Sequence, residues 1–182
     1  MSNGWIRNVA DRLAETLAQC HALQTWQGAD WTPVQLLERI HHHALPPPAS
    51  GDEHTLAELQ GYRPFILLYT EQGGGLTLQR DATGPACGGT AEGHLVVQLE
   101  QDVPVADAAD AAKAERDFER VVGLMMSTGV VAQPGLLELA ADPQWLPVTQ
   151  LVFRGIVRVD PEDVQQIGDA QRAFVDVMWR IG

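Results

Sequence analysis

Apolar residues recur at intervals of three and four through the first 24 residues, a spacing typical of a helix with one buried side. The polar residues between them fall elsewhere on the helical wheel and suit solvent. We therefore predict a helix over residues 5–24, followed by a break at Gly28. Its buried stripe is expected to consist of Ile6, Val9, Leu13, Leu17 and Cys20.

A second helix is predicted to begin at Thr32. Thr32 and Gln35 have the spacing of a capping box, and Pro33 suits the first helical position, where no amide proton is needed. The prolines at 46–48 cannot continue a helix, so the histidines at 41–43 are expected at its solvated end. Its buried face is expected to contain Val34, Leu37 and Ile40.

The pattern changes in the middle of the chain. Residues 64–69 form a short, continuous apolar run, which indicates a central strand buried on both faces. Residues 76–80 are a second expected strand, and the three glycines before it at 73–75 indicate a flexible hairpin loop. Residues 81–93 contain a proline and several glycines, which predicts an irregular loop.

Residues 94–100 are the next predicted strand. Apolar positions alternate there with more polar ones, so Glu100 is expected on a face that becomes solvated toward the strand's end. The longest helix is predicted over residues 106–126, and a short one near 136–140. The long helix is expected to bury Ala111, Phe118, Val121, Val122 and Met125.

The C-terminal part is predicted to be a hairpin of strands at 148–160 and 171–181, with Trp179 in the core. The resulting element order favours an α+β fold, with a mainly antiparallel sheet and helices packed on one face. A length of 182 residues, 45% of them hydrophobic, suits one compact unit, so residues 1–182 are expected to form a single domain.

The chain is acidic, with a formal net charge of −12. It has no basic cluster, so specific nucleic-acid binding is not expected, although an acidic surface can line a DNA passage without adhering to it. The start of the chain lacks the pattern of a signal peptide, and no run is long and apolar enough for a membrane span. We expect a protein that is cytosolic where it is made and binds no membrane.

No motif in the sequence indicates catalysis, a cofactor or a metal ion. The three consecutive histidines at 41–43 would point in different directions on a helix, and the glycines at 73–75 lack a phosphate-loop pattern. No serine or cysteine lies in a nucleophile motif, and Cys20 is expected to be a buried, reduced thiol. We therefore predict that the protein is not an enzyme.

Candidate contact residues come from the loops instead. Trp145 stands between Pro143 and Pro147, where an aromatic side chain either anchors an interface or covers the end of the core. The glycine-rich loops at 71–75 and 81–93 can become ordered on contact with a partner. The candidate interface residues are Gly73, Gly74, Gly75 and Trp145.

Four segments together carry a resemblance to a known family. They are YRPFILLY at 62–69, HLVVQLE at 94–100, FERVV at 118–122 and FVDVMWR at 174–180. In this order, after N-terminal helices, they resemble the tail-terminator and minor tail proteins of long-tailed bacteriophages, especially those of Mu-like prophages. The glycine-rich loop at 81–93 and the section with the proline loop are longer than in a minimal family member.

The resemblance implies a structural α+β subunit that forms a ring, of about six copies, at the head-proximal end of the tail tube. Its partners would be other copies of itself, the tail tube and head-completion proteins, in the bacterial host cytoplasm and then in the virion tail. Two alternatives remain open. One is another head–tail joining or tube protein, and the other is a small-molecule-binding domain or enzyme, which would have a pocket with His21 or His94 beside a carboxylate.

Overall fold

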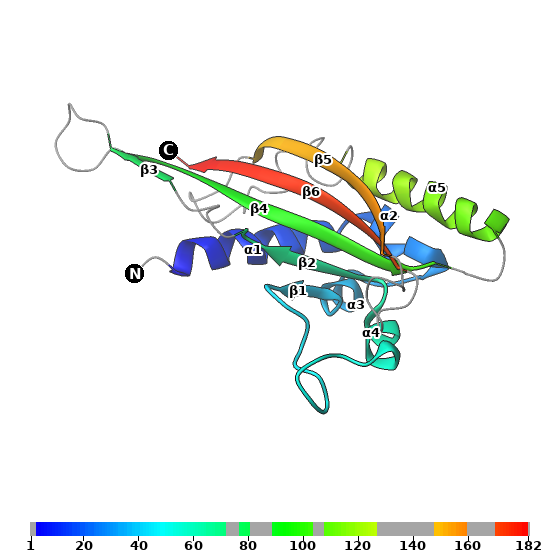
Figure 1. Cartoon of the computed structure of the whole chain (residues 1–182). Helices are drawn as coiled ribbons and strands as arrows, with labels where there is room; N and C mark the ends of the chain where they lie inside the picture. Colours follow the sequence, from blue (N-terminus) through cyan, green and yellow to red (C-terminus); the bar gives the residue numbers. More distant parts are fainter. Residues whose placement is uncertain are drawn as a thin grey trace.

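The computed structural model describes residues 3–71, 77–80, 89–103, 108–126, 148–159 and 170–181. A six-stranded mixed sheet forms its centre (Figure 1). Its strands are β1 (Ile40–His42), β2 (Phe65–Tyr69), β3 (Thr77–Arg80), β4 (Gly89–Asp102), β5 (Val148–Val159) and β6 (Ala170–Ile181).

The strands lie in the order β1-β2-β4-β6-β5, and β3 pairs with the first residues of β4. Strand β1 runs parallel to β2, and the other pairs are antiparallel. Strands β4 and β6 pair over twelve consecutive positions and form the centre of the sheet. The two edges of this path are therefore β1 and β5.

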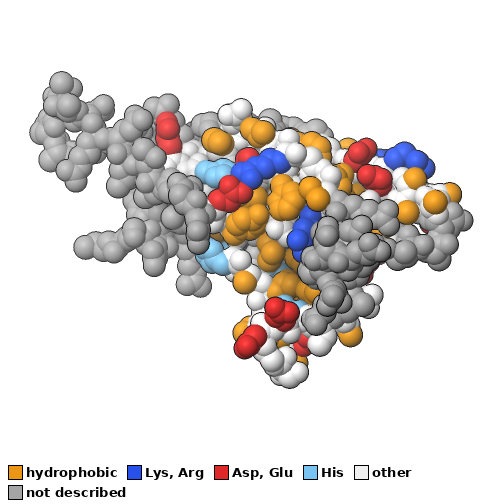
Figure 2. Space-filling view, viewed as in Figure 1, with side chains coloured by type: hydrophobic (Ala, Val, Ile, Leu, Met, Phe, Trp, Pro, Cys, Tyr) orange, Lys and Arg blue, Asp and Glu red, His pale blue; other side chains and the backbone are white. Residues whose placement is uncertain are grey.

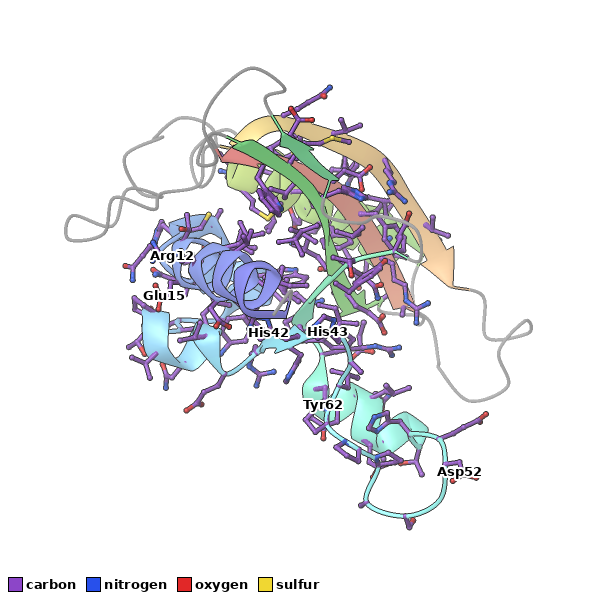
Figure 3. All side chains as sticks on the ribbon, turned by 90° about the vertical axis from the view of Figure 1, so that its left-hand side faces the viewer. Arg12, Glu15, His42, His43, Asp52 and Tyr62 are labelled. Carbon is purple, nitrogen blue, oxygen red and sulfur yellow. The ribbon has the colours of Figure 1, made fainter. Side chains whose placement is uncertain are left out.

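Helices cover one face of the sheet, which we call the inner face. They are α1 (Asn3–Ala18), α2 (His21–Gln24) and α5 (Ala108–Leu124), together with the short helix η1 (Trp26–Gly28), which follows α2. Helix α3 (Pro33–Leu37) packs on α1, and α4 (Leu56–Tyr62) lies beyond the β1 edge. The opposite, outer face of β4, β5 and β6 carries none of the described helices (Figure 3). The predicted α+β class with helices on one face is confirmed.

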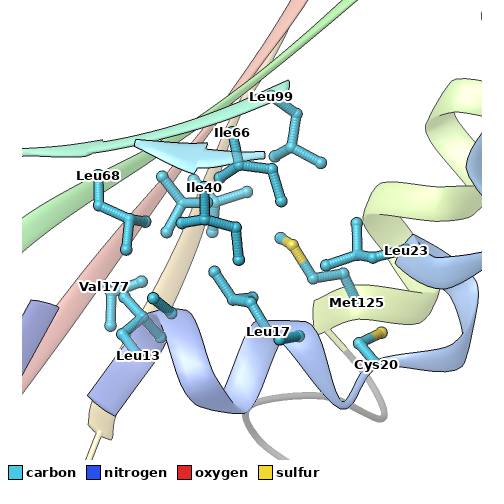
Figure 4. Packing of buried hydrophobic residues seen from close by; sticks show 14 of the residues in the cluster. Leu13, Leu17, Cys20, Leu23, Ile40, Ile66, Leu68, Leu99, Met125 and Val177 are labelled. Atoms are coloured by element: carbon cyan, nitrogen blue, oxygen red, sulfur yellow. The ribbon is translucent and has the colours of Figure 1, made fainter. Parts of the chain in front are cut away.

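The hydrophobic core lies between the inner face and these helices (Figure 4). Alternate residues of a strand point to the same face, so Ile66, Leu99 and Val175 all face the helices. Leu17 of α1 and Leu23 of α2 are completely buried against them. Burying each such side chain stabilises the fold by about 1.5–3 kcal/mol.

A buried polar chain crosses this core. The indole Nε1 of Trp26 donates a hydrogen bond to Oε1 of Gln101 at 2.7 Å, and Nε2 of Gln101 donates to Oε1 of Gln171 at 3.0 Å. The Trp26 ring stacks on Phe118, with ring centroids 5.6 Å apart. These contacts join η1, β4, β6 and α5, and they satisfy polar groups that would otherwise be costly to bury.

The N-terminal helix is confirmed, except that it is divided near Cys20 into α1 and α2. Cys20 is a buried free thiol, as expected, and Val9, Leu13 and Leu17 are buried with it. Helix α5 and the β5–β6 hairpin also form as predicted, with Trp179 in the core. The short helix expected near 136–140 lies outside the described residues.

The second predicted helix begins as expected but is shorter. Thr32 and Gln35 form the capping box, yet the helix ends at Leu37. Of the expected buried face, Ile40 is buried as predicted, but Val34 and Leu37 are exposed and Leu36 is buried instead. Residues 40–42 instead form β1, which provides the outer backbone groups of β2 with hydrogen-bonding partners.

Strand β4 extends further than predicted. It begins at Gly89, so residues 89–93, which were expected in a loop, pair with β6 or β3. Glu100 was expected on a solvated face and is only 2% exposed. Its carboxylate is buried because two arginines bind it, as described below.

Gly93 is required by the packing of Trp179 directly across from it on β6. A Cβ atom at Gly93 would lie 2.0 Å from Cζ2 of the Trp179 ring, far inside contact distance. We expect Gly93→Ala to force the buried ring to move and to lower the free energy of unfolding by about 1–3 kcal/mol. Urea denaturation would measure the change.

Gly123→Ala is the matched control, because Gly123 lies in α5 and a Cβ atom added there would meet no other atom within 4 Å. It should raise the stability by about 0.5–1 kcal/mol, since alanine favours the helix. Equal stability of the Gly93→Ala variant and the wild type would contradict the packing argument.

Candidate assembly surface

The interface residues chosen from the sequence, Gly73, Gly74, Gly75 and Trp145, lie outside the described residues. The candidate surface is therefore built from the outer face of the sheet and its β5 edge. Two groups of charged side chains and a set of exposed apolar ones define it. Figure 2 shows this face, with hydrophobic side chains beside the charged ones.

The first charged group joins three strands and the end of a fourth. Asp176 of β6 accepts a hydrogen bond from Nε of Arg154 on β5 at 2.5 Å and lies 2.9 Å from Nε2 of His94 on β4. Nη1 of Arg154 also donates to Glu71, just beyond β2, at 2.6 Å. Residues directly opposite each other on paired strands lie on the same face of the sheet. Asp176 therefore shares the outer face with Val152 of β5 and Val96 of β4.

These contacts shift the ionisation of the group. Burial alone would raise the pKa of Asp176, but the hydrogen bonds from Arg154 and His94 outweigh it and hold that pKa below its usual value. The hydrogen bond from Arg154 lowers the pKa of Glu71, and both carboxylates raise the pKa of Arg154. Burial and the charge of Glu71 raise the pKa of Tyr69. Arg154 and its two carboxylate partners, Asp176 and Glu71, are therefore charged at neutral pH.

The second charged group is centred on Glu100 of β4. Its Oε1 accepts a hydrogen bond from Nε of Arg63 at 2.9 Å and lies 2.8 Å from Nη2 of the same arginine as an ion pair. Its Oε2 accepts a hydrogen bond from Nε of Arg172 at 2.6 Å. Nη1 of Arg63 also donates to Asp102 at 2.8 Å. Across both groups every carboxylate has a basic partner, so this face carries little of the chain's negative charge.

Exposed apolar side chains lie next to these charges. Val152 and Val157 of β5 and Met178 of β6 stand on the outer face, and Phe153 of β5 is 43% exposed at the edge of the inner face. Strand β5 is twelve residues long and pairs on one side with β6, while no described strand pairs with its other side. A long edge strand with apolar side chains is a template for contact with another chain.

A pocket of about 920 Å³ lies elsewhere, between the α1–α2–η1 segment and α5. Trp26 and Gln101 line it together with His21 of α2. The α5 side alternates in charge at helical spacing, through Asp110, Lys113, Asp117 and Arg120. Residues three and four apart neighbour one another on a helix, so these charges can compensate each other without a ligand.

The three histidines lie in and after β1 and not at a helix end, so that expectation was wrong. His41 contacts the rings of Tyr62 and Phe65, and burial together with the charges of His42 and Arg39 lowers its pKa. His42 points instead toward Asp11 of α1, 3.5 Å away. Among the described residues, no group of three metal-binding side chains comes together.

The comparisons with known proteins identify no family. No protein-family model matches the chain, and no curated protein matches it. Among solved structures, the chain is similar to a chain of the virion of a native gene transfer agent particle, with 18% sequence identity and a TM-score of 0.43. The alignment covers 92% of this chain and 88% of that chain. Such values assign neither a family nor a function.

Sequence reasoning missed the charged groups because their members come from segments far apart. Arg154 and Glu71 are 83 positions apart, and Arg63 and Glu100 are 37 apart. In the sequence of the last strand, Asp176 alternates with Val175 and Val177, which places it on the side opposite Trp179. The charged residue between Phe174 and Met178 was the signal in the sequence that this face does not pack into the hydrophobic core.

Replacing Asp176 with asparagine tests the first charged group. Because the folded pKa of Asp176 is lowered, its stabilising contribution is present above the unfolded value of 3.8 and is lost as pH falls through the folded value. We expect Asp176→Asn to lower the free energy of unfolding by about 1–3 kcal/mol at pH 7. The difference from the wild type should shrink as the pH falls below about 4.

Asp52→Asn makes the same chemical change at an exposed position and should leave the stability unchanged. Denaturant titrations at several pH values would measure both variants. A difference between Asp176→Asn and the wild type that stays constant as the pH falls from about 7 to well below the unfolded pKa would contradict the assignment.

Proposed function

We propose that the protein is a structural component of a phage or prophage particle, and specifically a tail terminator that caps the tail tube and joins it to the head. The observation that carries the proposal is the β5 edge, a long strand with exposed apolar side chains beside a charge-compensated face. The sequence resemblance names the role, and its element order from β2 through α5 to the β5–β6 hairpin agrees with the fold.

The two edges of the sheet support a ring. Strand β5 is twelve residues long, whereas β1 at the other edge has three residues, so the two edges differ in length and chemistry. A contact that joins different surfaces of identical subunits repeats from copy to copy and closes into a ring when the rotation allows it. A ring of about six copies is the size that the resemblance implies.

The charge distribution agrees with a passage for DNA. The chain carries a net charge of −12, while the carboxylates of the outer face are bound to basic side chains. In the described part of the chain, exposed acidic side chains also lie away from this face, for example Glu115 and Glu119 on α5. An acidic surface around a passage keeps DNA from adhering to it. No described helix is long and apolar enough to cross a membrane.

A small-molecule-binding or enzymatic function is the second candidate. The pocket beside α5 favours it, because His21 lines that pocket with Asp110 and Asp117. His94 also has a carboxylate neighbour, Asp176, but that carboxylate is already bound to Arg154 on the sheet. The proposal that the protein is not an enzyme rests on this engagement of Asp176 and on the lack of a nucleophile motif.

Light scattering over a wide concentration range tests the proposal. We expect the wild-type protein to form a closed oligomer of about six copies, alone or when mixed with tail tubes, and to stop tube growth. Phe153→Glu should remain folded but lose at least about tenfold in assembly affinity, because a charge replaces an exposed apolar contact.

Leu124→Glu is the matched control, since Leu124 is 38% exposed but lies on α5, away from the β5 edge. It should assemble like the wild type. A wild-type protein that stays monomeric both alone and with tail tubes would overturn the proposed function.

A further inference from the structure

Residues 43–62 form a loop and helix α4, which together we call the flap. The flap leaves the sheet directly after β1 and returns toward β2 (Figures 1 and 3). Both of its ends are held by the sheet. The backbone N–H of His43 donates to the carbonyl of Leu68 at 2.9 Å, and Arg63, which follows the flap, binds Glu100. The contacts that the flap makes between these two anchors therefore decide whether it stays closed on the sheet.

Three aromatic rings connect the flap to the sheet. Tyr62, the last residue of α4, lies edge-on to the imidazole of His41 on β1, with ring centroids 5.9 Å apart. His41 in turn contacts Phe65 of β2, with ring centroids 6.2 Å apart. Phe65 is only 2% exposed, although it lies on the outer face opposite Glu100 and outside the hydrophobic core cluster. His41 therefore stands between the flap and a buried side chain of the sheet.

A second histidine and an arginine hold the same tyrosine. His54 of the flap contacts the Tyr62 ring with centroids 5.6 Å apart, and its buried Nδ1 has no hydrogen-bond partner in the described part of the chain. That nitrogen lies 4.0 Å from Oε2 of Glu58. Nη1 of Arg39 donates to the carbonyl of Tyr62 at 3.0 Å. The flap is thus attached through Tyr62, and two of the rings around this side chain can take up a proton.

The surroundings of His41 disfavour a positive charge. Burial, His42 and Arg39 all lower the pKa of His41 below its ordinary value of 6.5. The carboxylates of the neighbouring helices have other partners. Asp11 of α1 lies 3.5 Å from Nε2 of His42, and Glu58 of α4 accepts hydrogen bonds from backbone amides of the flap. A proton on His41 would therefore place a partly buried charge beside basic neighbours and against the two aromatic rings.

We propose that the flap opens from the sheet when His41 takes up a proton. In the open form His41 is solvated and binds a proton more readily than in the closed form, so acid favours opening. The closed form keeps its full stability above pH 6.5 and loses it as the pH falls from there toward the lowered pKa. Over that interval each pH unit favours opening by up to about tenfold. This device is independent of the proposed ring, because all its parts lie in one subunit.

Amide hydrogen exchange, corrected for the direct effect of pH on exchange, tests the proposal. In the wild type we expect the protection of residues 43–62 to fall by up to about tenfold per pH unit between pH 6.5 and about 5. The protection of residues 94–100 in β4 should not change over this range, because the opening is local.

His41→Phe keeps an aromatic ring beside Tyr62 and Phe65 but cannot take up a proton, so its flap should stay protected at low pH. His21→Phe is the matched control, because it makes the same change at an exposed position of α2, and it should retain the pH dependence of the wild type. If His41→Phe keeps that pH dependence while His54→Phe loses it, His54 is the controlling group and the proposal is overturned.

Two measurements on the wild type test the proposal without any variant. Nuclear magnetic resonance should show that the pKa of His41 lies below 6.5. A higher value would mean that the aromatic rings stabilise the imidazolium, and it would overturn the proposal. Flap protection that is independent of pH, or a loss that is equal in residues 94–100, would also overturn it. None of these outcomes depends on whether the protein assembles into a ring.

Discussion

The structure depends on the buried carboxylate of Glu100. A carboxylate that is 2% exposed is stable only when it is paired and hydrogen-bonded, and Arg63 and Arg172 provide three of the contacts. Arg63 comes from the segment that leads into β2, and Arg172 from β6. One side chain of β4 therefore connects the three central strands, and removing either arginine would leave the carboxylate undercompensated.

The two faces of β4 therefore carry different kinds of side chain and make different contacts. On the inner face, Leu95, Val97 and Leu99 pack against the helices, and Gln101 ends the same row with hydrogen bonds to Trp26 and Gln171. On the outer face, charged side chains are paired with one another across the strands. Among the described residues, no strand pairs with the outer edge of β5, and on β6 the buried Nε1 of Trp179 has no hydrogen-bond partner.

Local signals in the sequence predicted the elements well, and nonlocal ones were the source of error. The capping box at Thr32 was found because it involves residues three apart, and the alternation in the last strand was found for the same reason. The prediction that Val34 lies on a buried helical face was wrong, because residues 40–42 pair with β2 and form a strand instead of continuing the helix. The periodicity of the sequence cannot show such pairing. Glu100 was placed in solvent because its partners are 37 and 72 positions away. The charged groups of the candidate surface were missed for the same reason, because their members are also far apart in the sequence.

The inequality of the two edges favours a head-to-tail contact over a two-fold one. Proteins protect edge strands by keeping them short or by placing charges on them. Strand β1 is short, and the chain turns away after it at His43, which has a positive φ of 68°. Strand β5 is long, and Arg154 binds Asp176 on the neighbouring strand, so its charge does not protect the outer edge of β5. One edge is thus short, while the other is long and pairs on its outer side with none of the described strands. Unequal edges of this kind support the proposed ring, in which unlike patches of identical subunits meet.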